Sequence, residues 1–398
     1  MPDFACDLAS RLEQLRSTGL YRQLRRLDTA QASTIACAGR HLLNFSSNDY
    51  LGFANHDDLK QAAGIALEKF GAGAGSSRLI CGSLSPHAEL ETALAQFKGT
   101  EAALAFSTGY AAALGTIGAL VGAGDIVILD KLSHACLVDA ARLSGATLRV
   151  FAHNDLADLE NKLTWAQKKT SSETQNCRIL VVTESVFSMD GDLAPLAELV
   201  ALKQRFGAWL MVDEAHGTGL YGANRRGLAE ALGVSQQVEV QMGTLGKALG
   251  AAGGYIAGSR LLIDFLINKA RSFIFSTAPV PAATAAATAA VRLVQSPAGA
   301  QLLSQLWARV TELRAALGLD FPTVPSAIIP LIVGDETRAV DLAARLAEQG
   351  FLIPAIRYPT VARGKARLRI TLSATHTADQ VANLAKALNS LNLPVQES

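Results

Sequence analysis

The stretch VQMGTLGKALGAAGG (Val240–Gly254) carries one ionisable side chain, Lys247, among small and apolar neighbours. A lysine is costly to bury, so most lysines stay in water. In a tight apolar pocket the pKa of a lysine falls, and the free amine becomes a nucleophile. The alternative is a lysine at a helix end within a glycine-rich turn. This stretch alone leaves both interpretations open.

A phosphate-binding loop is a further alternative for the same residues, because GTLGK resembles the pattern G-x-x-x-x-G-K-[ST]. Gln241 stands where that pattern needs its first glycine. Ala248 stands where it needs the hydroxyl that binds magnesium. The pattern therefore fails at both ends, and the stretch does not predict a nucleotide site.

Short apolar runs alternate with helical segments on both sides of this stretch. We expect seven of them to be strands: Ala102–Phe106, Asp125–Asp130, Leu148–Phe151, Arg178–Glu184, Trp209–Glu214, Val238–Met242 and Gly254–Gly258. Apolar strands separated by helices predict an α/β fold with a mostly parallel sheet covered on both faces. The loops that follow the strands should then meet at one edge of the sheet.

The chain has 398 residues, enough for more than one domain. We expect an N-terminal helix and connector over residues 1–50 and a large α/β domain over residues 51–290. Residues 291–398 then form a small α+β domain. Within it, runs such as AIIPLIVGD and ARLRITLS read as strands, and helical patterns follow them.

Composition excludes several classes of protein. The 36 basic and 35 acidic residues leave no charge excess for nucleic acid or an anionic membrane. Five scattered cysteines without a C-x-x-C pair favour reduced thiols and predict no metal site. The start, MPDFACDLASRLEQL, has no basic segment before an apolar core, so we expect no signal peptide. Apolar runs such as Leu114–Gly124 are too short and too glycine-rich to span a bilayer, and the reduced cysteines favour a cytoplasmic protein.

Polar residues follow several of the expected strands. Gly109 and Tyr110 open a helix after Ala102–Phe106, and a helix start suits a phosphate. Asp213 ends an apolar strand, where a carboxylate needs a partner, and Lys247 follows the next strand. This arrangement suits pyridoxal phosphate, because the lysine can bond the cofactor while the aspartate keeps its ring nitrogen protonated.

Two of these side chains keep a structural interpretation when each is taken alone. His134 lies near an expected helix start and could be a capping or core histidine. Asp213 could cap a helix or form an ion pair. The set of residues favours the cofactor site over these separate interpretations.

Four stretches, in this order along the chain, closely resemble the α-oxoamine synthases, which are fold-type I pyridoxal-phosphate enzymes. They are NFSSNDYLGF (Asn44–Phe53), TESVFSMDGD (Thr183–Asp192), VDEAHGTG (Val212–Gly219) and GTLGKALGAAGG (Gly243–Gly254). The resemblance runs from about residue 20 to the end of the chain. It implies an aspartate-aminotransferase-like fold, pyridoxal 5'-phosphate as the cofactor and a homodimer.

The resemblance also implies roles for individual residues. Lys247, Asp213 and His134 would be catalytic, with the His134 ring stacked on the cofactor. Arg369, in RLRIT, would hold the amino-acid carboxylate, and Arg22 would meet the distal carboxylate of an acyl chain, with Arg25 and Arg26 as alternatives. The further implied positions are Gly109, Tyr110, Ser188, His216 and Thr244 for the cofactor, and Asn48, His134 and Thr360 for the substrates.

Within this family, HGTG at His216–Gly219 favours the member that joins L-alanine to a pimeloyl thioester in biotin biosynthesis. The thioester would be pimeloyl-CoA or pimeloyl-acyl carrier protein, and carbon dioxide and free thiol would be released. Another member, such as 2-amino-3-ketobutyrate CoA ligase or 5-aminolevulinate synthase, is the main alternative. A lyase or aminotransferase of the same fold and a catalytically inactive scaffold are the others.

Overall fold

The computed structural model describes residues 3–171 and 177–391. The chain forms two compact units. The large unit comprises Leu51–Ser188 and Asp192–Leu303, and the small unit comprises Met1–Tyr50, Met189–Gly191 and Ser304–Ser398. The expected division into parts at residues 50 and 290 stays a prediction.

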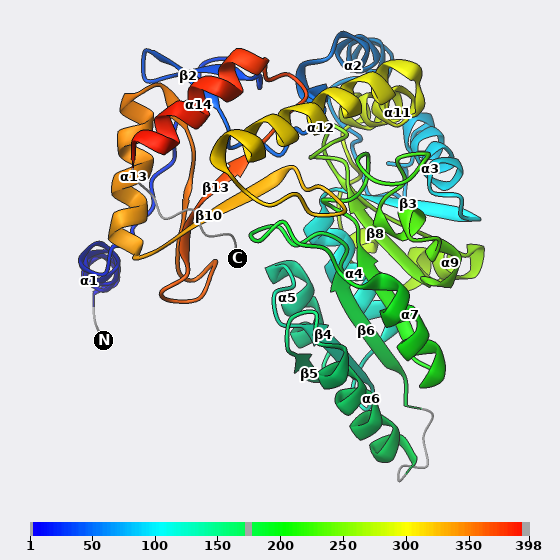
Figure 1. The fold of residues 1–398 in the computed structure, drawn as a ribbon. Helices are drawn as coiled ribbons and strands as arrows, with labels where there is room; N and C mark the ends of the chain where they lie inside the picture. The colour runs from blue at the N-terminus through cyan, green and yellow to red at the C-terminus, as the bar shows by residue number, and fades with distance from the viewer. Residues whose placement is uncertain (1–2, 172–176, 392–398) are drawn as a thin grey trace. The chain divides into compact units, whose positions relative to one another are not determined.

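The seven strands expected from the sequence form one sheet in the large unit, which confirms the predicted α/β fold (Figure 1). The order of the strands across the sheet is β3-β9-β8-β7-β6-β4-β5. Their bounds are β3 (Ala102–Phe106), β4 (Ile126–Asp130), β5 (Thr147–Phe151), β6 (Ile179–Glu184), β7 (Trp209–Asp213), β8 (Val240–Thr244) and β9 (Gly254–Gly258).

Strand β9 is the exception to the parallel arrangement, because it runs antiparallel to both β8 and β3. Only residues 245–253 connect β8 to β9, too few for a helical crossover, so the chain reverses direction. The start of β9 passes close to the start of the helix after β3. A Cβ built on Gly254 would lie 2.5 Å from the Cα of Gly109, so this approach requires glycine.

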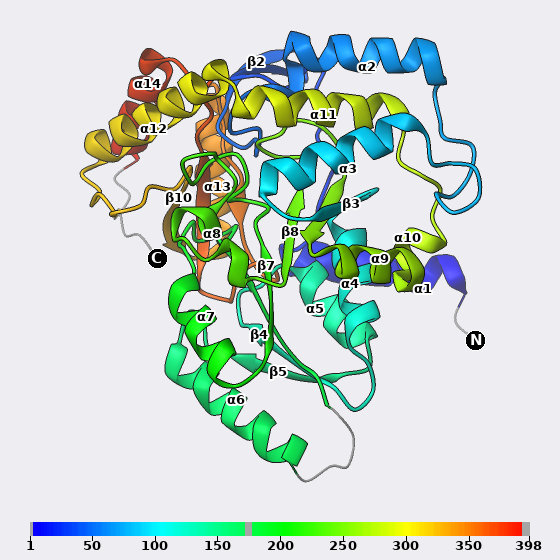
Figure 2. The same ribbon diagram turned by 90° about the vertical axis from the view of Figure 1, so that its right-hand side faces the viewer.

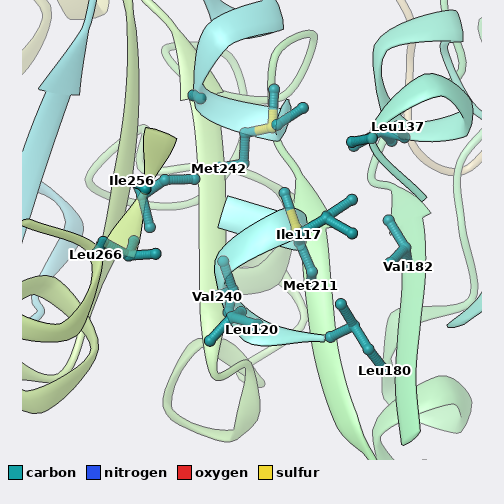
Figure 3. Close-up of a cluster of buried hydrophobic side chains, with 14 of the residues drawn as sticks. Ile117, Leu120, Leu137, Leu180, Val182, Met211, Val240, Met242, Ile256 and Leu266 are labelled. Carbon is teal, nitrogen blue, oxygen red and sulfur yellow. The ribbon is translucent and has the colours of Figure 1, made fainter. Parts of the chain in front are cut away.

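One face of the sheet packs on α4 (Gly109–Leu120), α5 (Ala135–Leu143), α9 (Arg260–Lys269) and α10 (Arg271–Ile274). Figure 3 shows this core, in which Ile117 and Leu120 of α4 lie against Met211 and Val240 of the central strands. The opposite face packs on α6 (Leu156–Ser171), α7 (Leu196–Arg205) and α8 (Leu228–Ala231). Alternate residues of β4, β6 and β7 enter the two cores, as the two-residue period of a strand requires.

Three further helices of the large unit pack together: α2 (Asp57–Phe70), α3 (Ser85–Lys98) and α11 (Pro281–Gln295). Figure 2 shows α11 running beside α2 and above α3. The glycine-rich segment between α2 and α3 is held by a bridge between Ser77 and Thr277. Two single 3-10 turns, Phe53–Asn55 and Ser235–Gln237, complete this unit.

The small unit holds two three-stranded sheets. One contains β10 (Ile328–Gly334), β13 (Ala366–Thr371) and β12 (Ala355–Ile356), in that order and antiparallel. The other contains β1 (Thr34–Cys37), β2 (Arg40–Asn44) and β11 (Phe351–Leu352). The N-terminal segment joins this unit because β2 pairs in parallel with β11. Its helices are α1 (Phe4–Ser17), α13 (Glu336–Glu348), α14 (Ala378–Ser390) and the later part of α12 (Pro297–Leu317).

In the described residues no helix combines the length and the apolar character that crossing a membrane requires.

Candidate active site

Charged side chains of the large unit gather where β4, β6, β7 and β8 end. Lys247 follows β8, and its Nζ lies 2.6 Å from Nε2 of His216, in the turn after β7. Asp213 ends β7 and is in register with Glu184, which ends β6. The backbone N–H of His134, after β4, donates to Glu184 Oε1 at 2.5 Å. The structure therefore brings together four side chains that the sequence placed in the site.

Asp213 and Glu184 form a buried pair of carboxyl groups, with exposed fractions of 4% and 2%. They point to the same face of two adjacent parallel strands, because residues in register share a face. Burial raises the pKa of both groups. The charge of Asp213 raises the pKa of Glu184 further, while Lys247 opposes the shift at both. Such a pair of buried acids favours a cationic N–H as its partner.

His134 caps α5, and its ring is held in one tautomer. The backbone N–H of Cys136 donates to His134 Nδ1 at 3.2 Å, and the Cys136 Sγ lies 3.0 Å from the same nitrogen. A nitrogen that accepts a hydrogen bond carries no proton, so the neutral ring carries its proton on Nε2. Desolvation and the charge of Lys247 lower the pKa of His134. The ring is therefore kept neutral, which suits stacking on a planar group.

The turn that presents His216 is organised by a buried acid. Glu214 is fully buried, and its carboxylate accepts the N–H groups of Leu228 and Ala229 at 3.1 and 2.8 Å. A Cβ built on Gly217 would lie 2.1 Å from Glu214 Oε2. The glycine after His216 is therefore needed for Glu214 to reach these two N–H groups.

The first residue of α4 lies close to Thr244, three residues before Lys247 in the chain. Gly109 is the first residue of α4, and a Cβ built on it would lie 3.8 Å from the Cβ of Thr244. The Thr244 hydroxyl donates to the carbonyl of Gly253 at 3.1 Å and accepts from the N–H of Gly246 at 3.2 Å. The N–H groups at the start of α4, together with this hydroxyl, form an arrangement suited to a phosphate.

Tyr110 follows Gly109 on α4. Its hydroxyl donates to the carboxylate of Asp139 on α5, and this hydrogen bond raises the pKa of Tyr110. Ser188 lies half-buried in the turn after β6, which a bridge between Val186 and Leu193 closes.

The small unit holds the predicted carboxylate-binding arginine. Arg369 is a buried residue of β13. Its Nη1 donates to the Thr371 hydroxyl at 2.9 Å, and its Nη2 donates to Asn48 Oδ1 at 3.1 Å. Both of these acceptors are neutral, so they orient the guanidinium without cancelling its charge. Asn48 and Arg369, which the sequence predicted as substrate residues, are therefore in direct contact.

The three candidate arginines for the acyl carboxylate differ in their surroundings. Arg22, Arg25 and Arg26 are all exposed. Arg26 forms an ion pair with Asp28, with Nε 2.6 Å from Oδ1.

The side chain of Arg357 connects the segment before Arg22 to the turn that contains Thr360. Arg357 donates from Nε to the carbonyl of Gly19 at 3.0 Å and from Nη2 to the carbonyl of Tyr21 at 3.2 Å. The N–H of Thr360 in turn donates to the carbonyl of Arg357 at 3.0 Å. Arg357 therefore ties the segment before Arg22 to the turn that carries Thr360 within the small unit.

Two buried acids of the site were missed in the sequence. Glu184 ends an apolar strand just as Asp213 does, so the rule that identified Asp213 could have identified it. Glu214 follows Asp213 directly, and only the fold shows that its side chain turns toward the start of α8. The described residues contain no group of three or more His, Cys, Asp or Glu side chains that could hold a metal ion.

The chain is similar to known proteins over almost its whole length. Residues 40–388 match the family model described as aminotransferase class I and II. A protein from Geobacter sulfurreducens named 8-amino-7-oxononanoate synthase is 48% identical over 384 residues, covering 96% of each chain. A protein of the same name from Anaeromyxobacter sp. (strain K) is also 48% identical, over 98% of this chain and 97% of its own.

Two solved structures extend the comparison. A serine palmitoyltransferase from S. paucimobilis, solved with a PLP–myriocin adduct bound, superposes with a TM-score of 0.89 at 30% identity and 98% coverage of both chains. An 8-amino-7-oxononanoate synthase from Francisella tularensis superposes with a TM-score of 0.73 at 25% identity, covering 88% of this chain and 98% of its own.

Proposed function

We propose that this chain, which belongs to the aminotransferase class I and II family and, within it, to the α-oxoamine synthases, is a pyridoxal-phosphate enzyme of biotin biosynthesis. It condenses L-alanine with a pimeloyl thioester. The products are 8-amino-7-oxononanoate, carbon dioxide and the free thiol of CoA or of a carrier protein.

The contact between Lys247 and His216, beside the buried Asp213, is the observation that carries this proposal. A pyridoxal ring requires an amine nucleophile, a buried acid and a neutral imidazole. Here these are Lys247, Asp213 and His134. The identity of 48% to proteins named 8-amino-7-oxononanoate synthase supports the choice of reaction within the family.

The residues of the large unit fit pyridoxal phosphate. Asp213 is buried beside a second carboxyl group, so a protonated ring nitrogen would relieve the repulsion between the two. The hydroxyls of Ser133 and Ser185 are buried and lack a hydrogen-bond partner among the described residues. Both lie next to His134 or Glu184 in the chain, so the site retains polar capacity that a bound group would use.

We assign the holding of the cofactor as follows. Asp213 would bind the ring nitrogen, the His134 ring would stack on the pyridine, and Lys247 would supply the amine that bonds the cofactor. Gly109, Tyr110 and Thr244, at or near the start of α4, would hold the phosphate. Ser188 and His216 would contact the phenolic oxygen.

Pyridoxal phosphate, when bound, supplies an electron-withdrawing ring next to the α-carbon of the amino acid. The chain's own residues position the reactants and hold the proton. Lys247 takes the α-proton of alanine at Nζ, and His216, 2.6 Å from that atom, orients the amine. Asp213 stays ionised while it accepts the ring N–H, and the neutral His134 excludes water from one side of the ring.

The substrate residues are assigned to the small unit. Arg369 binds the carboxylate of alanine, with Asn48 fixing the plane of its guanidinium. Arg22 meets the distal carboxylate of the pimeloyl chain, and Thr360 lies near the acyl group. Arg22 is preferred to Arg26, whose charge is already paired with Asp28.

A homodimer completes this proposal. Large apolar side chains are exposed near the glycine-rich segment between α2 and α3, among them Ile80 at 79% and Phe275 at 72%. A monomer gains nothing from exposing such side chains, whereas a symmetric interface would bury them. Ser276 or Thr277 of the partner subunit would then help bind the phosphate.

A panel of substrates tests the reaction. Pimeloyl-CoA with L-alanine should release free thiol, while glycine and serine should release it at a lower rate. One methyl group distinguishes alanine from glycine, which is worth about 1–3 kcal/mol and hence a rate ratio of roughly 10–200. Faster release with glycine and acetyl-CoA would assign the chain to a different reaction of the family. Absence of release with every pair, by protein that has bound cofactor, would reject the family reaction altogether.

A further inference from the structure

A second cluster of charged groups in the large unit lies outside the residues assigned above. His153 follows β5 and lies between two carboxylates. Its Nδ1 is 2.9 Å from Asp130 Oδ1, and its Nε2 is 2.7 Å from Asp192 Oδ2. The ring also packs edge-on against Phe187, with the centroids 4.3 Å apart. The imidazole is therefore fixed on three sides.

The two carboxylate contacts favour a protonated imidazole, since the Asn154 amide nitrogen, 3.3 Å from Nε2, has a shorter contact at 3.0 Å with Asp192 Oδ2. An ionised carboxylate only accepts hydrogen bonds, so each ring nitrogen must donate, and only the imidazolium carries a proton on both. Burial alone lowers the pKa of His153. The two hydrogen-bonded carboxylates, Asp130 and Asp192, outweigh burial and raise the pKa to about 10. The charged ring is then the stable form across the neutral range.

Asp130 connects this ring to the turn that carries His134. Asp130 ends β4 and is buried. Its Oδ1 also accepts the N–H of Leu132 at 2.8 Å, and its backbone carbonyl accepts the N–H of Ser133 at 3.2 Å. These two hydrogen bonds to Asp130 fix the conformation of residues 131–133, and His134 follows them directly.

Asp192 connects the same ring to the turn that carries Ser188. The carbonyl of Asp192 accepts the N–H of Phe187 at 3.0 Å, which closes the turn around Ser188. Its Oδ2 also accepts from Asn154 Nδ2 at 3.0 Å. Asn154 adopts a φ of 54°, a left-handed conformation that asparagine tolerates better than most residues. His153 and Asn154 together fix the far end of this turn.

We propose that His153 is a positioning residue, a charged bridge that sets the relative placement of the turns carrying His134 and Ser188. It contacts neither substrate nor cofactor and acts through Asp130 and Asp192. Its effect on cofactor binding rests on the function proposed above, whereas its protonation does not.

The first experiment observes the bridge itself. Protein labelled with ¹⁵N in its histidine side chains is compared with the His153→Gln variant, which assigns the His153 signals by their loss. At pH 8.5, without cofactor, both ring nitrogens of His153 should show the shifts and attached protons of an imidazolium. A neutral ring at that pH would overturn the proposal, and this outcome is independent of any reaction that the chain catalyses.

The second experiment measures what the bridge does. Apoprotein is titrated with pyridoxal phosphate and followed by absorbance, for the wild type, His153→Gln and Asp192→Asn. Loss of a group that supports a site from behind costs roughly tenfold to a hundredfold in the affinity for what that site binds. Both variants should therefore bind the cofactor more weakly by about tenfold or more. His41→Gln, a change at an exposed histidine of β2, is the matched control and should bind as the wild type does.

Thermal melting of the same apoproteins separates positioning from general stability. Asp192→Asn keeps the size of the side chain and lies at a partly exposed turn, so it remains a test even where His153→Gln folds poorly. Unchanged affinity in a folded Asp192→Asn and a folded His153→Gln would overturn the proposal. Failure of the wild type to bind pyridoxal phosphate would instead reject the proposed function, while the imidazolium signal still reports on the bridge.

The pH dependence supplies the last readout. The folded pKa of His153 lies above the ordinary value of 6.5, so its stabilisation is complete below pH 6.5 and is lost as the pH rises through about 10. The melting temperature of the wild type should exceed that of His153→Gln by most at pH 6, and the gap should close toward pH 10. A gap that stays constant over this range would overturn the role of the charge.

Discussion

In the seven-stranded sheet, buried charges are paired differently where the parallel strands begin and where they end. Where the strands begin, two buried charges have opposite partners among the described residues. Asp125, before β4, accepts two hydrogen bonds from Arg178, before β6, and forms an ion pair with its guanidinium. Lys203 of α7 pairs with Glu239, before β8. At the edge where strands end, Glu184 and Asp213 stand side by side. The strand ends also hold a paired acid, Asp130 with His153, but the buried Glu184 and Asp213 lie next to each other there, with Lys247 as the nearby positive charge.

This difference explains why the same sheet serves both stability and chemistry. Glu239, for example, pairs with Lys203 through one oxygen and accepts the backbone N–H of Leu210 at 2.8 Å through the other. Two buried carboxyl groups whose pKa values are both raised, Glu184 in part by the charge of Asp213, retain capacity for a cationic donor. Changes at the strand ends should therefore affect reaction and cofactor binding, and changes at the strand starts should affect folding.

Lys247→Ala should have the largest effect. It removes the amine that bonds the cofactor and takes the α-proton, so release of thiol from pimeloyl-CoA should fall by at least roughly 10³-fold. The purified variant should also lose the yellow colour that the wild type is expected to show. If the variant keeps a tenth of the wild-type rate of thiol release, Lys247 is not the group that takes the α-proton. The strand ends would then not be the part of the sheet that carries the reaction.

Glu184→Gln should have an intermediate effect, visible in the pH dependence of stability without cofactor. The folded pKa of Glu184 is raised to about 8 from an ordinary 4.5. The unfolded chain therefore releases this proton first, and the wild type loses stability as the pH rises from 4.5 to 8. The variant lacks this loss, so its free energy of unfolding relative to the wild type should rise by about 1.4 kcal/mol for each pH unit between these two values. A difference that does not change with pH would show that Glu184 ionises normally.

Lys203→Ala should have the smallest effect and serves as the counterpart of Lys247→Ala at the other edge. The Glu239 partner is partly exposed, so water compensates for much of the lost pair. The free energy of unfolding, measured with urea, should fall by about 1 kcal/mol, and the rate of thiol release should not change. A loss of rate without a loss of stability would contradict the division between the two edges.

Much of the fold could be predicted from the sequence, because it depends on local pattern. The apolar runs at residues 102–106 and 254–258 match β3 and β9 in both bounds. The direction of β9 did not follow from that pattern, since a strand's periodicity is the same in either direction. The reversal depends on the short connection after Thr244 and on the close approach at Gly254, which becomes visible only with the sheet assembled.

The site divides in the same way. Lys247 and Asp213 could be identified because a charge at the end of an apolar run stands out from its neighbours. The contact of Asn48 with Arg369 joins residues more than three hundred positions apart, which no local pattern reveals. Likewise His153 follows an ordinary strand in the sequence. Its importance depends on Asp130 and Asp192, which reach it from two other segments.

The position of β9 also bears on how the chain is made. Strand β3 lies at the edge of the sheet and pairs only with β9, with Phe106 opposite Gly254. At a synthesis rate of about 5–20 residues per second, β3 leaves the ribosome roughly 7–30 s before its partner exists. All five of its residues are buried in the finished protein. During that interval the backbone groups of the apolar strand β3 have no partner strand. We therefore expect the nascent chain to be prone to aggregation until residue 258 is translated.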